Sequence, residues 1–323
     1  MLDECCPTFP QTPTRVHCLT RQIGTAKKLR LRLEYLGARI VLAACSLFPL
    51  APLREAGAAL GWFAYRVIRI RRRVTLQNIM DSLPELSRSE ASHIGLESYK
   101  NFGRSMMEFS AFQRMSGQRF WEMTTVEGHE HPKAALAHGR GGIIITGHLG
   151  NWELLGAGIA REGFPVHGSD TRHTNELTHR IIKDLRGRQG VKVLDPEQSV
   201  ASMLRLLANN QFVAYLPDQD AGRSGVFVEF FGRPASTRRS PAILSLRAGC
   251  PIIPVFIARE RPDRHHIIYR ELIWPDPTRR GRDSVVDITQ RYTRMLEEMV
   301  RRYPETYFWM HRRWKTKQPG PQP

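Results

Sequence analysis

The sequence predicts an α/β fold with a largely parallel central sheet flanked by helices, preceded by an N-terminal membrane-associated helical segment. The sheet is predicted because short apolar runs bounded by glycines alternate along the chain with helix-forming stretches, and no internal repeat interrupts them. The membrane-associated part is predicted by apolar segments followed by a run of arginines. We expect a flexible tail over 1–28, a membrane-anchoring segment over 29–78, a main domain over 79–316 and a frayed tail over 317–323.

The N-terminal segment has too little continuous apolar sequence for an ordinary membrane span. Its apolar run 40–53 is shorter than the roughly 20 residues that a spanning helix needs, and Pro49 and Pro52 lie near its end. A second apolar stretch, 56–64, is followed by a dense group of arginines at positions 66, 69 and 71–73. Each basic residue near an anionic leaflet adds about 1 kcal/mol of attraction. We therefore expect an interfacial or re-entrant anchor on an anionic membrane; a tilted single span and a soluble core hairpin are the alternatives.

The elements of the main domain follow from local patterns. A helix is expected over 87–107, because Ser87 can cap it and apolar residues recur at helical spacing. The β-branched run 143–145 is bounded by glycines and indicates a buried strand, and Asn151 can cap the helix after it. Further strands are expected over 165–168, 191–194, 212–216 and 252–258, and further helices over 176–188, 197–209, 240–248 and 284–302.

The composition limits the class of partner. The 323 residues suffice for one large domain or two modest ones, and a formal charge of +17 indicates an anionic partner. Nucleic acid, an acidic membrane, a phosphorylated substrate and an acidic carrier protein all meet that condition. The five cysteines have no paired metal-ligand spacing, and their odd number favours a reducing compartment over a disulfide framework. We expect no metal.

The turn between the strand 143–145 and the following helix has the residues for acid–base chemistry. On one continuous helix, His148 and Glu153 would point about 140° apart, because each residue turns the chain by about 100°. They can meet if His148 lies on the turn and Glu153 in the first helical turn, and Gly147 and Gly150 allow such a backbone. A carboxylate that orients a neutral imidazole makes it a better general base. A structural histidine and a glutamate that only answers the helix dipole remain the alternatives.

Several motifs together resemble one known family. The sequence Gly147-His148-Leu149-Gly150-Asn151-Trp152-Glu153 resembles the His-x4-Glu motif of the bacterial lipid A biosynthesis acyltransferases, the lauroyl and myristoyl late-acyltransferase family. Four further blocks agree in the same order, at residues 216–220, 225–237, 249–255 and 307–315. The resemblance extends from about residue 30 to 316, and it is specific because five ordered blocks share it.

The resemblance implies an acyltransferase domain over 79–316. This domain would move a fatty acyl chain from an acyl carrier protein, or from a CoA thioester, to a hydroxyl of a membrane glycolipid such as a lipid A precursor. Its place would be the cytoplasmic face of the cell inner membrane. His148 would be the general base and Glu153 its orienting partner. The implied substrate-binding residues are Arg172, Asn175, Asp218 and Asp220. No cofactor is expected, because a thioester is already activated.

Positively charged groups also have expected roles, and other acceptors and another activity are alternatives. Arg172 and the amides that begin the helix after His148 are expected to stabilise an oxyanion. Exposed basic residues, Arg238, Arg239 and the cluster Arg312, Arg313 and Lys315, are expected to attract the acidic donor or lipid. Lysophospholipid or another glycolipid is an alternative acceptor. A membrane-associated hydrolase is an alternative activity, but the chain has no Gly-x-Ser-x-Gly elbow. Binding to nucleic acid is not expected, because it explains neither the apolar segments nor the His–Glu turn.

Overall fold

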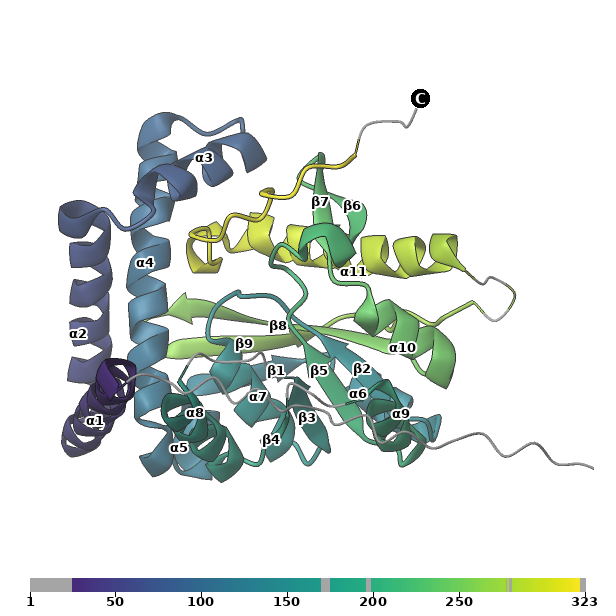
Figure 1. Ribbon diagram of the computed structural model, residues 1–323, viewed down its shortest axis with the longest axis horizontal. Coiled ribbons are helices and arrows are strands. Elements are labelled where there is room, and N and C mark those ends of the chain that lie inside the picture. The colour runs from purple at the N-terminus through teal and green to yellow at the C-terminus, as the bar shows by residue number, and fades with distance from the viewer. Residues whose placement is uncertain (1–24, 170–174, 196–198, 277, 279–280, 320–323) are drawn as a thin grey trace, which may run out of the picture.

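The protein is built around one mixed sheet of seven strands (Figure 1). The computed structural model describes residues 25–169, 175–195, 199–276, 278 and 281–319. The strand order is β1-β9-β8-β2-β5-β3-β4, and every neighbouring pair is parallel except β8 and β9. The strands are β1 (Thr124–Glu127), β2 (Gly142–Ile145), β3 (Val166–Ser169), β4 (Lys192–Leu194), β5 (Phe212–Tyr215), β8 (Ile252–Arg261) and β9 (Arg264–Tyr269). The predicted α/β class with a largely parallel sheet is therefore confirmed.

Helices cover both faces of this sheet. They are α1 (Thr25–Leu47), α2 (Leu50–Phe63), α3 (Arg72–Ser82), α4 (Arg88–Ser110), α5 (Gly117–Met123), α6 (Glu130–Ala137), α7 (Trp152–Arg161), α8 (Glu176–Arg188), α9 (Val200–Ala208), α10 (Ser240–Ala248) and α11 (Arg282–Arg302). Short helical turns lie at Ala64–Ile68, Phe112–Arg114, Gly222–Ser224 and Pro304–Thr306. Most helices that the sequence predicts begin and end within a few residues of these bounds, and α8 and α10 match fully.

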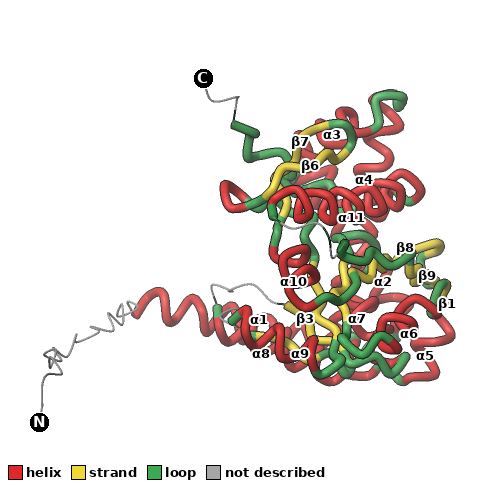
Figure 2. Tube along the Cα trace, turned by 90° about the vertical axis from the view of Figure 1, so that its right-hand side faces the viewer, coloured by secondary structure: helices red, strands yellow, loops and turns green. Residues whose placement is uncertain are grey.

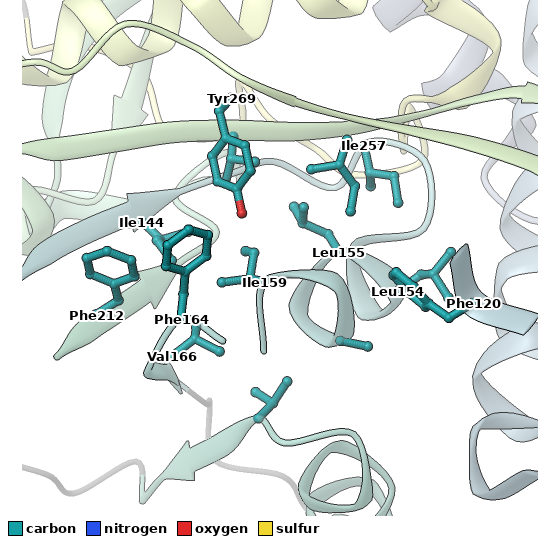
Figure 3. Close-up of a cluster of buried hydrophobic side chains, with 14 of the residues drawn as sticks. Phe120, Ile144, Leu154, Leu155, Ile159, Phe164, Val166, Phe212, Ile257 and Tyr269 are labelled. Carbon is teal, nitrogen blue, oxygen red and sulfur yellow. The ribbon is translucent and has the colours of Figure 1, made fainter. Parts of the chain in front are cut away.

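The two faces of the central strands divide the core. Along β2, Ile144 packs with α7, whereas Ile143 and Ile145 pack with α9, α10 and α11, because successive strand residues point to opposite faces. Figure 3 shows the α7 side of this core, where Leu155 and Ile159 lie between the strand residues Ile144 and Val166 and the antiparallel pair β8–β9. These strands are buried on both faces, which explains their continuous apolar sequence.

Several parts of the fold were not predicted from the sequence, among them two strands of the sheet and a hairpin. The edge strand β1 and its neighbour β9 were missed, and β9 is the strand that makes the sheet mixed. The block at residues 225–237 is a β-hairpin of β6 (Val226–Phe230) and β7 (Arg233–Thr237), which contacts α11. Edge and hairpin strands have polar residues on one face, so their local sequence is less apolar than that of the central strands.

The N-terminal helices α1, α2 and α3 pack on α4 and form an N-terminal layer beside one end of β8 and β9 (Figure 1). Helix α2 packs so closely on α4 that a Cβ atom on Gly57 would stand 2.4 Å from the carbonyl oxygen of Gly103, so only glycine fits at this crossing. The expected break near Pro49 is present, because Pro49 lies between α1 and α2. Figure 2 shows α1 extending away from the body of the molecule. None of the helices within the described ranges combines the length and hydropathy that crossing a membrane requires.

Candidate active site

The catalytic candidates lie at the carboxyl ends of two neighbouring parallel strands. His148 follows β2 and Asp218 follows β5, and these strands pair directly. Because parallel strands end at the same edge of a sheet, the two side chains meet there. Gly147 precedes His148, and a Cβ atom at that position would lie 2.6 Å from Leu296 and 3.3 Å from the Asp218 carboxylate. The glycine therefore gives the carboxylate room beside the chain.

Asp218 holds both the ring and the backbone of His148. The Nδ1 atom of His148 lies 2.7 Å from Oδ1 of Asp218, and the backbone N–H of His148 donates to Oδ2 at 2.8 Å. The carbonyl oxygen of His148 accepts a hydrogen bond from the N–H of Phe308 at 2.9 Å. The imidazole also makes an edge contact with the ring of Trp152. With Nδ1–H donated to Asp218, the neutral ring has its lone pair on Nε2.

The pKa values of this pair move in the directions that favour an ion pair. Burial lowers the pKa of His148, but the charge and hydrogen bond of Asp218, and then the charge of Glu153, raise it above its ordinary value of 6.5. Burial raises the pKa of Asp218, but the charge of His148, its two hydrogen bonds and the charge of Arg313 lower it. The carboxylate is thus ionised, and it stabilises an imidazolium when Nε2 takes up a proton.

Glu153 is near His148 but does not hold its ring. Its two carboxylate oxygens accept hydrogen bonds from Nε and Nη2 of Arg186, at 2.8 and 2.7 Å. The expectation that Glu153 orients the imidazole is therefore corrected, because Asp218 occupies Nδ1. Glu153 lies in the first turn of α7 and Arg186 in the last turn of α8, where each charge opposes the local helix dipole. Its effect on His148 is electrostatic.

An apolar pocket begins beside these residues. It lies between α7 and the strands β3 and β5 and is open to solvent at one end. Trp152, Glu153 and Arg186 line it together with Thr146, the residue that follows β2. Its other lining residues are mostly apolar or glycine. They come mainly from β2, α7, β3, β5 and the residue before β4: Ile144, Leu155, Gly156, Ile159, Val166, Gly168, Val191, Ala214 and Leu216, with Phe112, Ser169 and Gln189.

The C-terminal block at residues 307–315 places Tyr307 and Arg313 close to Asp218. Arg313 is only 3% exposed, and its guanidinium donates to the carbonyl oxygen of Ser236 and to the hydroxyl of Thr237 on β7. Burial, and then the charge of Asp218, raises the pKa of the Tyr307 phenol well above its usual value. The expectation that Arg313 is an exposed charge is wrong: it is a buried cation that helps to keep Asp218 ionised. Arg312 is exposed.

The remaining predicted substrate residues have structural partners or lie outside the described residues. Arg172 lies outside the described residues. Asn175 is buried and caps α8 through its Oδ1 atom, while its Nδ2 atom donates to Leu31 of α1 at 2.9 Å. Asp220 accepts two hydrogen bonds from Thr316, at 3.2 and 2.8 Å, and so ties down the C-terminal block. Binding of substrate by these three residues stays a prediction.

Two residues at the site, Gln219 and Arg186, were not predicted from the sequence. Gln219 follows Asp218, and its amide nitrogen lies 3.4 Å from Nε2 of His148. Arg186 is the partner of Glu153, and nothing in its helical sequence distinguishes it from the other basic residues of α8. The position of Asp218 at the end of a predicted strand was a usable signal, because it placed the carboxylate at the same sheet edge as His148.

Comparisons with known proteins identify the family. A family model described as bacterial lipid A biosynthesis acyltransferase matches residues 24–316. The lipid A biosynthesis lauroyltransferase of Escherichia coli (strain K12) is 27% identical over 293 residues, which cover 89% of this chain and 93% of that protein. The lipid A biosynthesis palmitoleoyltransferase of the same strain is 25% identical, with 82% and 85% covered. A phosphatidylinositol mannoside acyltransferase of Mycolicibacterium smegmatis is 26% identical, with 68% and 70% covered. The chain therefore belongs to the bacterial lipid A biosynthesis acyltransferase family and is an enzyme that transfers acyl groups.

Proposed function

We propose that this enzyme transfers a fatty acyl chain from an acyl thioester to a hydroxyl of a membrane glycolipid such as a lipid A precursor, with His148 as the general base. The observation that supports this most is the Asp218–His148 pair, which places the lone pair of the ring on Nε2, beside the Gln219 amide. Trp152, whose ring contacts the imidazole, lines an apolar pocket. A glycolipid acceptor is consistent with the names of the lipid A relatives, and also with that of the mycobacterial relative.

The proposed reaction proceeds in two proton transfers at one nitrogen. Nε2 of His148 takes the proton of the acceptor hydroxyl as its oxygen attacks the thioester carbonyl carbon. The tetrahedral intermediate then collapses, the carbon–sulfur bond breaks, and the leaving thiolate takes the proton back from Nε2. Asp218 stabilises the imidazolium between these steps, since its carboxylate is ionised and 2.7 Å from Nδ1. The nearby amide of Gln219 is placed to contact the attacking hydroxyl.

The oxyanion of the intermediate requires positive groups close to the carbonyl carbon. The first turn of α7 begins at Trp152, shortly after His148, and points its backbone N–H groups toward the loop. The guanidinium of Arg186 lines the pocket and is held in one orientation by Glu153. We assign Glu153 the role of fixing Arg186, and of raising the pKa of His148 through space.

The acyl chain is proposed to lie in the apolar pocket. The pocket begins at Trp152 and Thr146, next to the catalytic histidine, and continues between α7 and the strands β3 and β5. Burying a methylene group in such surroundings contributes about 0.8 kcal/mol. This placement brings the thioester carbonyl to the mouth of the pocket, within reach of the proposed base. The donor is proposed to be an acyl carrier protein, because an enzyme with a charge of +17 attracts an acidic carrier; CoA is the alternative.

The N-terminal layer is proposed to lie on an anionic membrane, at the cytoplasmic face of the cell inner membrane. Of the seventeen large apolar side chains that are exposed in the described part of the chain, thirteen lie between Leu29 and Ile70. This apolar surface comprises Leu29, Leu33, Leu36, Ile40, Val41, Leu47, Phe48, Leu60, Trp62, Phe63, Val67, Ile68 and Ile70. Exposed arginines at 66, 69, 71 and 73 lie at its end. An exposed apolar face of this size beside basic residues is typical of an interfacial membrane contact.

The test is a reconstituted reaction followed by mass spectrometry. The purified full chain in detergent is given an acyl carrier protein thioester or acyl-CoA, with a lipid A precursor, a lysophospholipid or no acceptor. We expect acylated lipid A precursor, and we expect His148→Ala to reduce its rate at least about a hundredfold, the lower end of general-base effects. His93→Ala is the matched control, because His93 is exposed on α4.

The outcomes separate the candidate functions. Free fatty acid formed at the same rate with and without acceptor would identify a hydrolase. Acylation of the lysophospholipid alone would keep the enzyme class but change the acceptor. Full activity in a correctly folded His148→Ala variant would remove the general-base assignment.

A further inference from the structure

A buried carboxylate contacts the catalytic loop, residues 146–151 between β2 and α7, and also side chains from three other elements. Glu108 of α4 is fully buried, and its oxygens accept hydrogen bonds from Nε of Arg54 at 2.6 Å and from both Nη atoms of Arg259 at 2.8 and 2.7 Å. Nδ2 of Asn151 donates to Oε2 at 2.7 Å, and Nε2 of His265 lies 3.3 Å from Oε1. These partners come from α2, β8, the catalytic loop and β9.

The charges of this cluster make Glu108 its organising group. Burial raises the pKa of Glu108, but the charge of Arg259 is among the effects that hold it well below its ordinary value, so the carboxylate is ionised. Two buried guanidinium groups face this single negative charge, since Arg54 is 2% exposed and Arg259 is 6% exposed. Buried charges are tolerated only when they are paired and hydrogen-bonded, so the cluster has little freedom to rearrange.

Asn151 connects this rigid cluster to the catalytic residues. It is 1% exposed, and its Oδ1 atom accepts the N–H of Leu154 at 3.1 Å, which makes it the cap of α7. In the sequence it lies between His148 and Glu153. A second link runs through Ser105, whose hydroxyl accepts from Arg259 at 3.0 Å and donates to the carbonyl oxygen of the adjacent Gly150 at 3.5 Å.

We propose that Glu108 is a positioning residue for the acyl transfer. It acts through Asn151 on the loop that carries His148 and on the beginning of α7, which carries Glu153. The proposal rests on the proposed function for its kinetic readout. Glu108 fixes the beginning of α7, and this sets the distance from His148 to Asp218 and from Glu153 to Arg186. The same carboxylate binds Arg54 of α2, so the position of α2 is fixed relative to the catalytic loop. This helix exposes Leu60, Trp62 and Phe63.

The test uses Asn151→Ser, because serine retains the helix cap but is too short to reach Glu108. Glu108→Gln is less suitable, since it leaves two buried guanidinium groups without a counter-charge and is expected to misfold. For Asn151→Ser we expect kcat per folded molecule to fall at least about tenfold with KM changed less than about twofold. The NMR-measured pKa of His148 should move down, because a looser contact with Asp218 raises it less.

The matched control is His265→Gln. Within the described residues, the ring of His265 has hydrogen-bond contacts with Glu108 and Arg259, and none with the loop. This variant should therefore lower Tm but keep the wild-type kcat per folded molecule and the wild-type His148 pKa. A wild-type kcat and His148 pKa in Asn151→Ser would overturn the proposal, as would equal losses in both variants. The NMR readout does not depend on the reaction. A wild type that transfers acyl groups to no acceptor, with the His148 pKa still shifted in Asn151→Ser, would therefore count against the proposed function and not against the positioning role.

Discussion

At the scale of single residues, the site depends on which carboxylate contacts His148. Asp218 is almost fully buried and makes two hydrogen bonds to His148, one to the ring and one to the backbone. Glu153 is closer in sequence, yet it pairs with Arg186. A bond from Asp218 can both select the tautomer and stabilise the charged ring, whereas Glu153 acts on the ring only through space.

Asp218→Asn should therefore shift the pH dependence as well as reduce turnover. The base must be neutral, so activity is lost as pH falls through the pKa of His148, which in the wild type lies above 6.5. Without the Asp218 charge, burial lowers this pKa, and the acid limb of kcat/KM should move to lower pH. Turnover should fall at least about a hundredfold, since an amide disfavours the tautomer with a free Nε2. An acid limb that stays in place would assign the titration to another group.

Glu153 and Arg186 should behave as one unit. Glu153→Gln removes a charge that holds the guanidinium and raises the pKa of His148, so kcat/KM should fall and the acid limb should move slightly down in pH. In a double-mutant cycle with Arg186→Gln, we expect a coupling of at least about 1 kcal/mol, as is usual for contacting residues. Additive losses would show that Glu153 acts on the site independently of Arg186.

Much of the residue-level site could be predicted from sequence, but its pairing could not. The turn with His148, the cap at Asn151 and the acidic strand end at Asp218 are local signals, and the structure has all three. The imidazole contacts Asp218 and not Glu153, because β5, which precedes Asp218, lies next to β2. This strand order cannot be seen in a local sequence pattern. The burial of Arg313 depends on long-range packing against β7, which no local pattern reveals.

At the scale of elements, α7 and β3 form two walls of the proposed acyl pocket. Gly156 of α7 and Gly168 of β3 both face Val191, and a Cβ atom at either position would be 3.4 or 3.6 Å from that side chain. These are ordinary contact distances, so a small side chain fits without a clash while it occupies pocket space. The two glycines therefore set how deep the pocket is.

Gly168→Ala and Gly156→Ala should shift the donor preference toward shorter acyl chains. The added methyl group takes the place of a terminal methylene, whose burial contributes about 0.8 kcal/mol, so kcat/KM for the longest accepted donor should fall about fourfold. Competition assays with a series of donors of increasing length, read by mass spectrometry, measure this preference. Gly187→Ala is the matched control, because nothing lies within 4 Å of its Cβ position. An unchanged preference in both pocket variants would place the acyl chain elsewhere.

The elements also show where sequence patterns are sufficient. Central strands and capped helices were predicted because their signals are local: β2 is a β-branched run, and Ser87 forms a complete capping box at the beginning of α4. Strand β1 was missed because its partner β9 is distant in sequence. Strand β9 forms a hairpin with β8, but it begins with the polar residues Arg264, His265 and His266. In β1, buried and more exposed residues alternate, and in β9 the apolar run is only three residues long, so both apolar signals are weak.

At the scale of the whole molecule, the N-terminal layer is both part of the fold and the proposed membrane contact. Helix α2 inserts Arg54 into the buried cluster around Glu108 and packs through Gly57 on α4. Removal of residues 1–73 would therefore uncover the core, and the resulting aggregation would say little about membranes. Substitutions confined to the exposed side of α2 and its continuation test the membrane contact without disturbing these interior contacts.

The combined variant Leu60→Ser, Trp62→Ser and Phe63→Ser should bind anionic vesicles at least about tenfold more weakly, because these side chains are 56%, 47% and 45% exposed in the free protein. The remaining binding should be electrostatic, supplied by the arginines that follow. It should therefore weaken steeply with salt, as the Debye length falls from about 10 Å at 0.1 M to about 3 Å at 1 M. Wild-type binding should retain a salt-resistant part, since apolar insertion is not screened.

The matched control for this measurement is Trp121→Ser with Trp274→Ser, two tryptophans that are 40% and 41% exposed outside the N-terminal layer. The control should bind vesicles as the wild type does, in a cosedimentation assay at low and high salt. Turnover on a detergent-dispersed acceptor should be the same for all three proteins, because the catalytic loop is held from inside by Glu108 and Asn151. Equal vesicle binding by the triple variant and the wild type would assign the apolar surface to another protein partner. A loss shared with the control would instead point to a general effect of removing exposed aromatic groups.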